Sequence, residues 1–134
     1  MIFEQITPKK RLNIRTGDVF AYKLTTESFY RVGYIIEKDG IVGAMHQCTI
    51  LQFFTTTITT LDEEPILNPD DFLCHPLIEG GLCWKEGYFQ NIKRKVELDG
   101  RKTFYFQEKY KKSNAAFYDN HGNKFDEIPQ TIHY

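Results

Sequence analysis

Histidine and cysteine are the side chains of this sequence best suited to chemistry, because both types bind transition metals and both act in nucleophilic catalysis. His46 and Cys48 are two residues apart, so on a strand they would share a face. No pair of these side chains has the Cys-x-x-Cys spacing of a structural zinc site. We therefore expect cysteines that pack in the core, and neither a metal nor another cofactor. The set is His46, Cys48, Cys74, His75 and Cys83.

Catalytic motifs give equally weak signals. No serine lies in a Gly-x-Ser-x-Gly elbow, and no glycine-rich loop has phosphate-binding spacing. His121 lies in an Asn-His-Gly turn, where histidine is tolerated in an unusual backbone geometry. The adjacent carboxylates Glu63-Glu64 and Asp70-Asp71 are typical of a solvated surface. We predict that the protein is not an enzyme, and a structure without a pocket of convergent polar groups would count against the enzyme alternative.

Charge is segregated along the chain although its total is close to zero. The net charge is −1, from 17 basic and 18 acidic side chains, which gives no long-range attraction to nucleic acid or membrane. Residues 62–79 contain six acidic side chains and no basic one. This stretch is either a solvated loop or a surface that binds a basic partner. Its acidic members are Asp62, Glu63, Glu64, Asp70, Asp71 and Glu79.

Residues 93–112 carry the opposite charge, with eight basic side chains against three acidic ones, and they interleave these with aromatic residues. A sheet that binds single-stranded nucleic acid would show this pattern, with bases stacked on rings and phosphates on lysines. A β-hairpin with outward charges and inward rings would show it too, and this is the interpretation that we favour.

Length and composition favour one β-rich domain over residues 1–134. Aromatic residues make up 15% of the chain, with 11 Phe and 8 Tyr, and they suit the half-buried faces of sheets. No apolar run approaches the length of a membrane span. An odd number of cysteines without a signal peptide argues against a disulfide framework. We expect a cytoplasmic protein with no membrane partner.

The elements that would position any site start with a hairpin over residues 16–37. Residues 19–24 are apolar on both faces, which predicts a strand buried on both sides. Residues 29–37 alternate, with Tyr30, Val32, Tyr34 and Ile36 on one face. Gly33 in mid-strand predicts a bulge or a close backbone approach. Since this hairpin is needed for packing, we expect its residues to lie outside the functional site.

Turn and capping signals divide the next stretch. Asp39-Gly40 predicts a hairpin turn, followed by a strand over residues 41–54 that bends near residues 45–47. The threonines of residues 55–60 either extend that strand or form a short edge. Asn68, Pro69 and the following carboxylates predict one short helix over residues 69–75.

The second half has more strands and fewer landmarks. Residues 82–84 are predicted as strand, and residues 92–98 and 103–107 as a hairpin around Asp99-Gly100. Residues 115–118 are the last strand. Residues 1–14 are expected to form a lead-in arm or edge strand, and residues 124–134 a tail. The expected fold is therefore mainly β, or α+β with little helix: a strongly bent antiparallel sheet or a small barrel, with one short helix.

Several of these residues resemble a known family in their order and spacing. Gly17-Asp18-Val19-Phe20-Ala21, followed by Tyr30-Arg31-Val32-Gly33-Tyr34, is similar to the opening of the immunity protein 26 family. Leu82-Cys83-Trp84-Lys85 with Gly87 is similar to that family's tryptophan-containing strand. The stretch from Ala116 to Gly122 is similar to its closing turn, so the resemblance covers residues 15–129.

The resemblance implies a bacterial immunity protein of a polymorphic toxin system, which binds a cognate toxin domain, often a nuclease, and neutralises it stoichiometrically without a cofactor. Toxin nucleases tend to present basic surfaces, so the charge of residues 62–79 makes its six acidic side chains our candidate partner-binding surface. The alternative is a domain that binds single-stranded nucleic acid through residues 93–112.

Overall fold

The computed structural model describes residues 2–42, 45–68, 70–74, 76–94, 96, 105–107, 117–119 and 124–125. These residues form eight strands and one short helix. In chain order the elements are β1 (Val19–Tyr22), β2 (Tyr30–Val42), β3 (Met45–Ile58), β4 (Leu77–Glu79), α1 (Leu82–Lys85), β5 (Gln90–Lys93), β6 (Tyr105–Gln107), β7 (Phe117–Asp119) and β8 (Lys124–Phe125).

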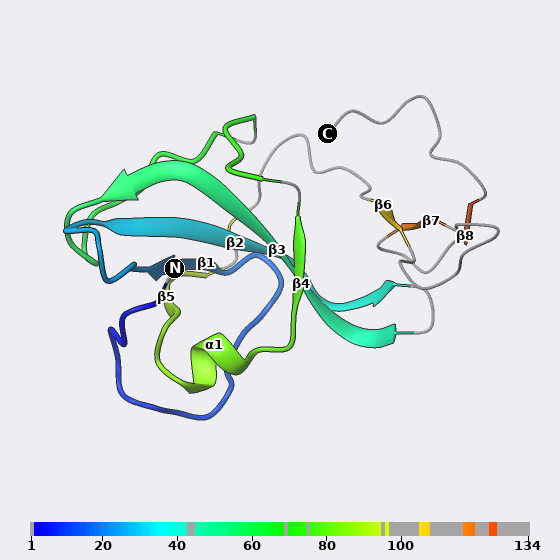
Figure 1. Ribbon diagram of the computed structural model, residues 1–134, viewed down its shortest axis with the longest axis horizontal. Coiled ribbons are helices and arrows are strands. Elements are labelled where there is room, and N and C mark those ends of the chain that lie inside the picture. Colours follow the sequence, from blue (N-terminus) through cyan, green and yellow to red (C-terminus); the bar gives the residue numbers. More distant parts are fainter. Residues whose placement is uncertain are drawn as a thin grey trace.

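Five strands make one antiparallel sheet with the order β4-β3-β2-β1-β5, in which β2 and β3 are long and strongly twisted (Figure 1). A second, small sheet has the order β6-β7-β8. The prediction of a mainly β fold is thus confirmed. Within the described residues the large sheet is open, with β4 and β5 at its edges, so of the two predicted forms the bent sheet is the one observed.

The hairpin of β2 and β3 is longer than the sequence suggests. β2 continues through Asp39 and Gly40, so the predicted turn at these residues is wrong. Gly40 instead pairs with Cys48 at an irregularity of the ladder, where an added Cβ would lie 2.7 Å from Cδ1 of Ile50. The strand predicted over residues 41–54 starts too early, because β2 continues to Val42 and β3 starts at Met45. β3 runs to Ile58, so residues 55–58 of the threonine stretch extend this strand, and Thr59 and Thr60 follow it as a bend.

Each face of the sheet has its own hydrophobic core. One face buries Val32, Tyr34 and Ile36, with Tyr30 packed beside them, as the alternation predicts. The other face buries the aromatic residues Phe20, Tyr22, Trp84 and Phe89. All residues of β1 are buried, which confirms the prediction of a strand covered on both sides.

The aromatic face is covered by the first residues of the chain and by α1 (Figure 1). The arm forms one isolated bridge between Phe3 and Leu24, and the Phe3 ring packs on the rings of the aromatic core. Ion pairs of Glu4 with Lys23 and of Lys9 with Glu86, together with backbone hydrogen bonds, also hold the arm. The amide of Ile6 donates to the Gly87 carbonyl at 2.9 Å, and that of Lys10 to the Lys85 carbonyl at 3.1 Å. The arm is therefore part of the fold, with one bridge in place of an edge strand.

The helix lies where a strand was predicted. α1 occupies residues 82–85 between Gly81 and Gly87, whose φ angles of 90° and 81° place both in the left-handed region that favours glycine. The chain can therefore turn sharply at both ends and bring Trp84 under the sheet. The strand predicted at residues 82–84 is accordingly wrong.

The helix predicted over residues 69–75 is also wrong, as the described residues 70–74 run along the edge of β3. The Thr55 amide donates to the Asp71 carbonyl at 3.1 Å, and the Leu73 amide to the Phe53 carbonyl at 2.9 Å. Asn68 forms a local turn by accepting a hydrogen bond from the Asp70 amide. Pairing with β3 and the packing of Phe72 beside Phe54 outweigh the capping signal.

Among the described strands, β5 and β6 are not paired with each other as the predicted hairpin requires. β5 pairs with β1 at the edge of the large sheet, whereas β6 pairs with β7 in the small one. The predicted Asp99-Gly100 turn lies outside the described residues. Lys124 and Phe125, the first two residues assigned to a tail, form β8 against β7. No described helix has the length and apolar character needed to cross a bilayer.

Candidate functional site

The acidic stretch covers the face of the sheet that lies opposite the aromatic face. Leu61, Leu67 and Phe72 pack against the core formed by Val32, Tyr34 and their neighbours, so the segment's apolar side chains point inward. The carboxylates between them point outward, because burial of an unpaired charge is unfavourable. We call residues 61–79 the acidic cover segment.

Three of its carboxylates are used within the molecule. Glu63 Oε2 accepts hydrogen bonds from the amide and hydroxyl of Thr59, the former at 2.6 Å. Glu64 forms an ion pair with Lys93 of β5, which ties the segment to the far edge of the sheet. Glu79 accepts a hydrogen bond from the Gly81 amide at the start of α1.

The other three carboxylates are available to a partner. Asp62, Asp70 and Asp71 are exposed, and their side chains make no hydrogen bond or ion pair with another described residue. Large apolar side chains are exposed in the same segment: Ile66, Leu73, Leu77 and Ile78, with Leu73 and Leu77 about half exposed at 50% and 49%. The segment ends in β4, whose one neighbour among the described strands is β3.

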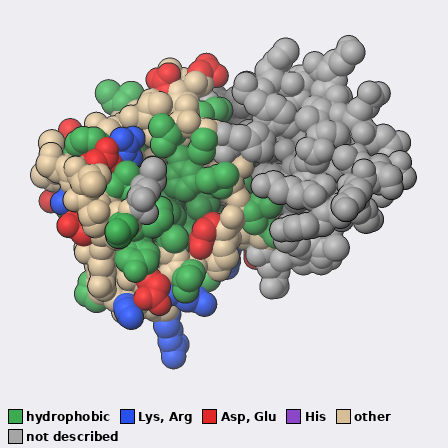
Figure 2. Space-filling view, viewed as in Figure 1, with side chains coloured by type: hydrophobic (Ala, Val, Ile, Leu, Met, Phe, Trp, Pro, Cys, Tyr) green, Lys and Arg blue, Asp and Glu red, His purple; other side chains and the backbone are tan. Residues whose placement is uncertain are grey.

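Figure 2 shows how these residue types are distributed over one face of the molecule. Hydrophobic side chains gather over the centre of this face, and acidic side chains stand apart from one another around them. An exposed apolar area with polar groups at its rim is the usual composition of a protein-binding surface.

The cysteines and histidines considered for metal binding are not assembled in the described structure. No group of three or more His, Cys, Asp and Glu side chains that could hold a metal occurs in the part that is described. Cys48 is buried as expected of a core cysteine, but Cys74 is exposed, so the expectation of core packing is wrong for Cys74. Burial, with a further contribution from Glu79, raises the pKa of the Cys83 thiol to about 11, so this thiol is a weak nucleophile. The side chains of His46, His75 and His121 lie outside the described residues.

Of the eight basic residues in the stretch 93–112, Lys93 and Arg94 have described side chains, and both contact acidic residues. They also line a pocket that the sequence analysis missed. This pocket has a volume of about 350 Å³ and lies between the N-terminal arm, α1 and β5. Its lining is Lys10, Asn13, Trp84, Gln90, Asn91, Ile92, Lys93 and Arg94.

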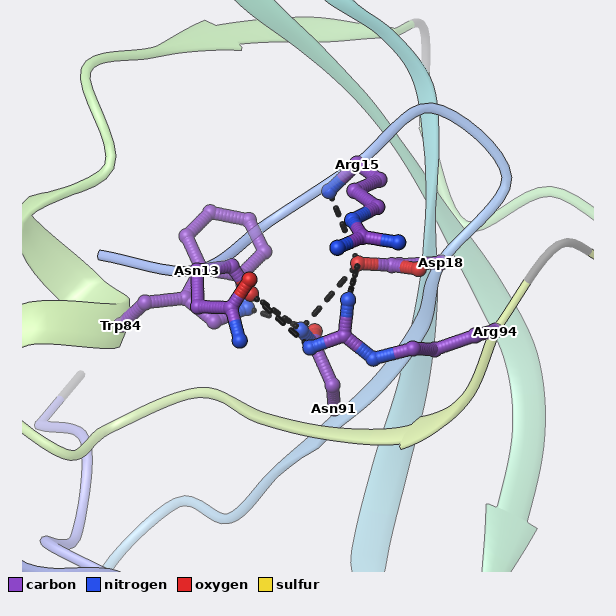
Figure 3. A network of polar contacts seen from close by, with 6 residues as sticks. All are labelled: Asn13, Arg15, Asp18, Trp84, Asn91 and Arg94. Atoms are coloured by element: carbon purple, nitrogen blue, oxygen red, sulfur yellow. Dashed lines mark hydrogen bonds and ion pairs between the residues drawn. The ribbon is translucent and has the colours of Figure 1, made fainter. Parts of the chain in front are cut away.

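A polar network forms one wall of this pocket, with residues from the arm, the start of β1, α1 and β5 (Figure 3). The Trp84 indole Nε1 donates to Asn91 Oδ1 at 2.9 Å. Asn91 Nδ2 donates to the Asn13 carbonyl at 3.1 Å and to Asp18 Oδ2 at 3.2 Å. Arg94 donates to the same Asn13 carbonyl at 3.2 Å.

Asp18 is the centre of this network and is fully buried, with 0% of its surface exposed. Its Oδ2 accepts a hydrogen bond from the Arg15 amide at 2.8 Å and lies 3.7 Å from Arg94 Nη1, while Oδ1 has no hydrogen-bond partner. Burial raises the pKa of this carboxyl above its ordinary value of 3.8, although the Arg15 amide and Arg94 act in the opposite direction. Through its contacts with Asn91 Nδ2 and Arg94 Nη1, the side chain of Asp18 fixes both residues in position.

The sequence signal for this site was weak. Gly17-Asp18 predicts a turn, and nothing in the adjacent residues indicates that the carboxylate is buried. Asn91 and Arg94 lie more than seventy positions further along the chain, as the Asn91–Asp18 separation of 73 residues shows. Asp18 belongs to residues 16–37, which we expect to lie outside the functional site, and its contacts with Asn91 and Arg94 reach the pocket wall.

Comparison with known proteins gives no match: no protein-family model, no curated protein and no solved structure matches the chain. The relation to the immunity protein 26 family therefore stays a prediction, as do the nucleic-acid alternative and the absence of enzymatic activity.

Proposed function

We propose that the protein binds a protein partner stoichiometrically through the acidic cover segment, and that this partner is a toxin domain with a basic surface. One observation carries the proposal. Asp62, Asp70 and Asp71 are exposed carboxylates with no partner among the described residues, and exposed Leu73 and Leu77 lie in the same segment.

This combination suits a protein partner on physical grounds. Apolar side chains at the middle of an interface provide the area removed from water, and charged side chains around them guide association and select the partner. β4 has a free edge among the described strands, so the partner's backbone can also pair with it. We choose a toxin domain as the partner because residues 15–129 resemble the immunity protein 26 family.

The test is binding to the toxin domain encoded beside this protein, measured by calorimetry with the full chain. We expect a one-to-one complex whose affinity falls with salt, because exposed charges are screened. Changing Asp62, Asp70 and Asp71 together to Lys should weaken binding by about a hundredfold or more, as three favourable pairs become repulsive. Asp39→Lys is the matched control, since Asp39 is exposed but lies on β2.

The two parts of the proposal fail separately. Unchanged affinity in the triple variant would remove the acidic cover segment as the surface but leave toxin binding in place. Absence of a complex with the wild-type chain at low salt would remove the function itself. Substituting Glu63 or Glu79 is avoided here, because these side chains accept hydrogen bonds from the protein's own backbone, and Glu64 is left unchanged because it is paired with Lys93.

A further inference from the structure

The pocket between the arm, α1 and β5 has a lining of one charge sign. Its three charged lining residues are Lys10, Lys93 and Arg94, and none of its lining residues is acidic. Lys10 lies on the arm, and Lys93 and Arg94 are consecutive residues at the end of β5 and just after it. Amide side chains of Asn13, Gln90 and Asn91 supply further polar groups. Such a lining attracts an anion and repels a cation.

The cations are available to a ligand. Lys10 is exposed, and its side chain makes no ion pair with another described residue. Lys93 is paired with Glu64, but both side chains are largely exposed, at 48% and 73%, so water and salt screen the pair and a ligand can replace Glu64. Arg94 has five N–H donors, of which the Asn13 carbonyl takes one and Asp18 faces another.

Asp18 gives the site a fixed element. Its buried carboxylate lies 3.7 Å from Arg94 Nη1, so a cation of the pocket wall is oriented before any ligand arrives. Both N–H groups of Asn91 Nδ2 are used within the protein, by the Asn13 carbonyl and by Asp18. Binding to groups already in position loses less conformational entropy than binding to mobile ones.

We propose that this pocket binds a small phosphate monoester. A phosphate carries nearly two negative charges and three terminal oxygens, which matches three cations: Lys10 on the arm, and the consecutive residues Lys93 and Arg94. A carboxylate offers two oxygens in one plane and would leave one cation without a contact. The volume of about 350 Å³ accommodates the phosphate together with a small organic group.

The protein has its own probe for this ligand. Trp84 is the single tryptophan of the chain, lines the pocket and donates to Asn91. We would titrate the full chain with glycerol 3-phosphate and with adenosine 5′-monophosphate, following Trp84 emission and backbone amide shifts. Glycerol and sodium chloride at matched ionic strength are the ligand controls. A saturable change with at least one phosphate ester, with shifts centred on residues 10–13 and 90–94, is the expected result, and the preferred ester identifies the attached group.

Variants assign the effect to the pocket. Lys10→Gln and Lys93→Gln should each weaken binding by about tenfold, the loss expected for one charge-assisted hydrogen bond. Glu64→Gln should strengthen binding a few-fold, because it removes the carboxylate that competes for Lys93. Lys9→Gln is the matched control, since Lys9 is the exposed neighbour of Lys10 but does not line the pocket, and it should leave binding unchanged.

Three outcomes would overturn the proposal. The first is no saturable change with either phosphate ester. The second is an equal loss of affinity in Lys9→Gln, which would mean a diffuse charge effect. The third is binding of single-stranded oligonucleotides but of neither ester, which would assign the cations to nucleic acid.

Discussion

Gly33 faces the ring of Phe20 across the aromatic core, and replacing this glycine tests the register of β1 and β2 directly. Gly33 pairs with Phe20 in that register. A Cβ on Gly33 would lie 2.7 Å from Cε2 and 2.8 Å from Cε1 of Phe20, and closer still to Cζ. Gly33→Ala therefore requires the ring to move.

The ring has little room to move. Phe20 is 0% exposed, its centroid is 4.7 Å from that of Phe89 in a stacked arrangement, and it is 4.9 Å from that of Trp84. Overpacking a core of this kind costs about 1–3 kcal/mol, and we expect the upper end because the ring's neighbours are themselves buried rings. Replacing glycine with alanine also stabilises by about 0.4–1 kcal/mol through the unfolded chain. The net loss in free energy of unfolding should be about 2 kcal/mol.

Urea unfolding followed by Trp84 emission and by circular dichroism measures this loss. Gly80→Ala is the matched control, because no heavy atom lies within 4 Å of its added Cβ, and it should be neutral or slightly stabilising. In a Phe20→Leu background, Gly33→Ala should cost less than in the wild type, since the smaller side chain leaves space. Equal stability of Gly33→Ala and Gly80→Ala would refute the predicted contact and with it the register.

Three further predictions concern the polar network and the thiols. Burial raises the folded-state pKa of Asp18, so between the unfolded and folded pKa values the folded protein binds more protons than the unfolded chain. As pH rises through that window, the free energy of unfolding of the wild type should therefore fall relative to that of Asp18→Asn. Urea titrations at a series of pH values measure this difference, and the opposite slope would contradict the prediction. Trp84→Phe should lower the free energy of unfolding by at least about 1–3 kcal/mol, because Asn91 Oδ1 loses its hydrogen-bond donor. A double-mutant cycle with Asn91→Ala that gives no coupling energy would show that this hydrogen bond is not the cause. A disulfide reagent at pH 8 should modify the exposed Cys74 first. Cys83 has a pKa of about 11, so only roughly one part in a thousand of it is thiolate at pH 8. The fast phase of the modification should therefore be absent in Cys74→Ser.

The sheet's core was predictable where a single periodicity applies. Residues 19–22 are apolar on both faces and predict burial on both sides, residues 30–36 alternate and predict one buried face, and Gly33 signals the close approach of Phe20. Local signals failed where tertiary pairing competes with them. Asp39-Gly40 is compatible with a turn, but the ladder with β3 continues past it, and Asn68-Pro69 is compatible with a helix start, but the following residues gain more by pairing with β3.

The candidate site was predictable only in part. The exposure of Asp62, Asp70 and Asp71 can be predicted, because they are charged side chains in an acidic stretch without basic residues. The contacts of Glu63, Glu64 and Glu79 inside the molecule depend on neighbours whose positions the sequence does not give. The pocket was out of reach because its wall joins Asn13, Asp18, Trp84 and Asn91 from four separate segments. Each is an ordinary residue until the fold brings them together.

The way in which the aromatic face is covered predicts unequal protection of the backbone amides against hydrogen exchange. β1 is buried on both faces and paired on both edges, so its amides can exchange with solvent only when the whole sheet opens. The arm is held by a few backbone bonds, such as those of Glu4 to Lys23 and Ile6 to Gly87, by two ion pairs with exposed members, and by the Phe3 ring. Its amides should exchange by lifting of the arm alone, which would bare Tyr22 and Phe89 to water while β1 stays closed. The core and its cover are thus two kinetic units within one sheet.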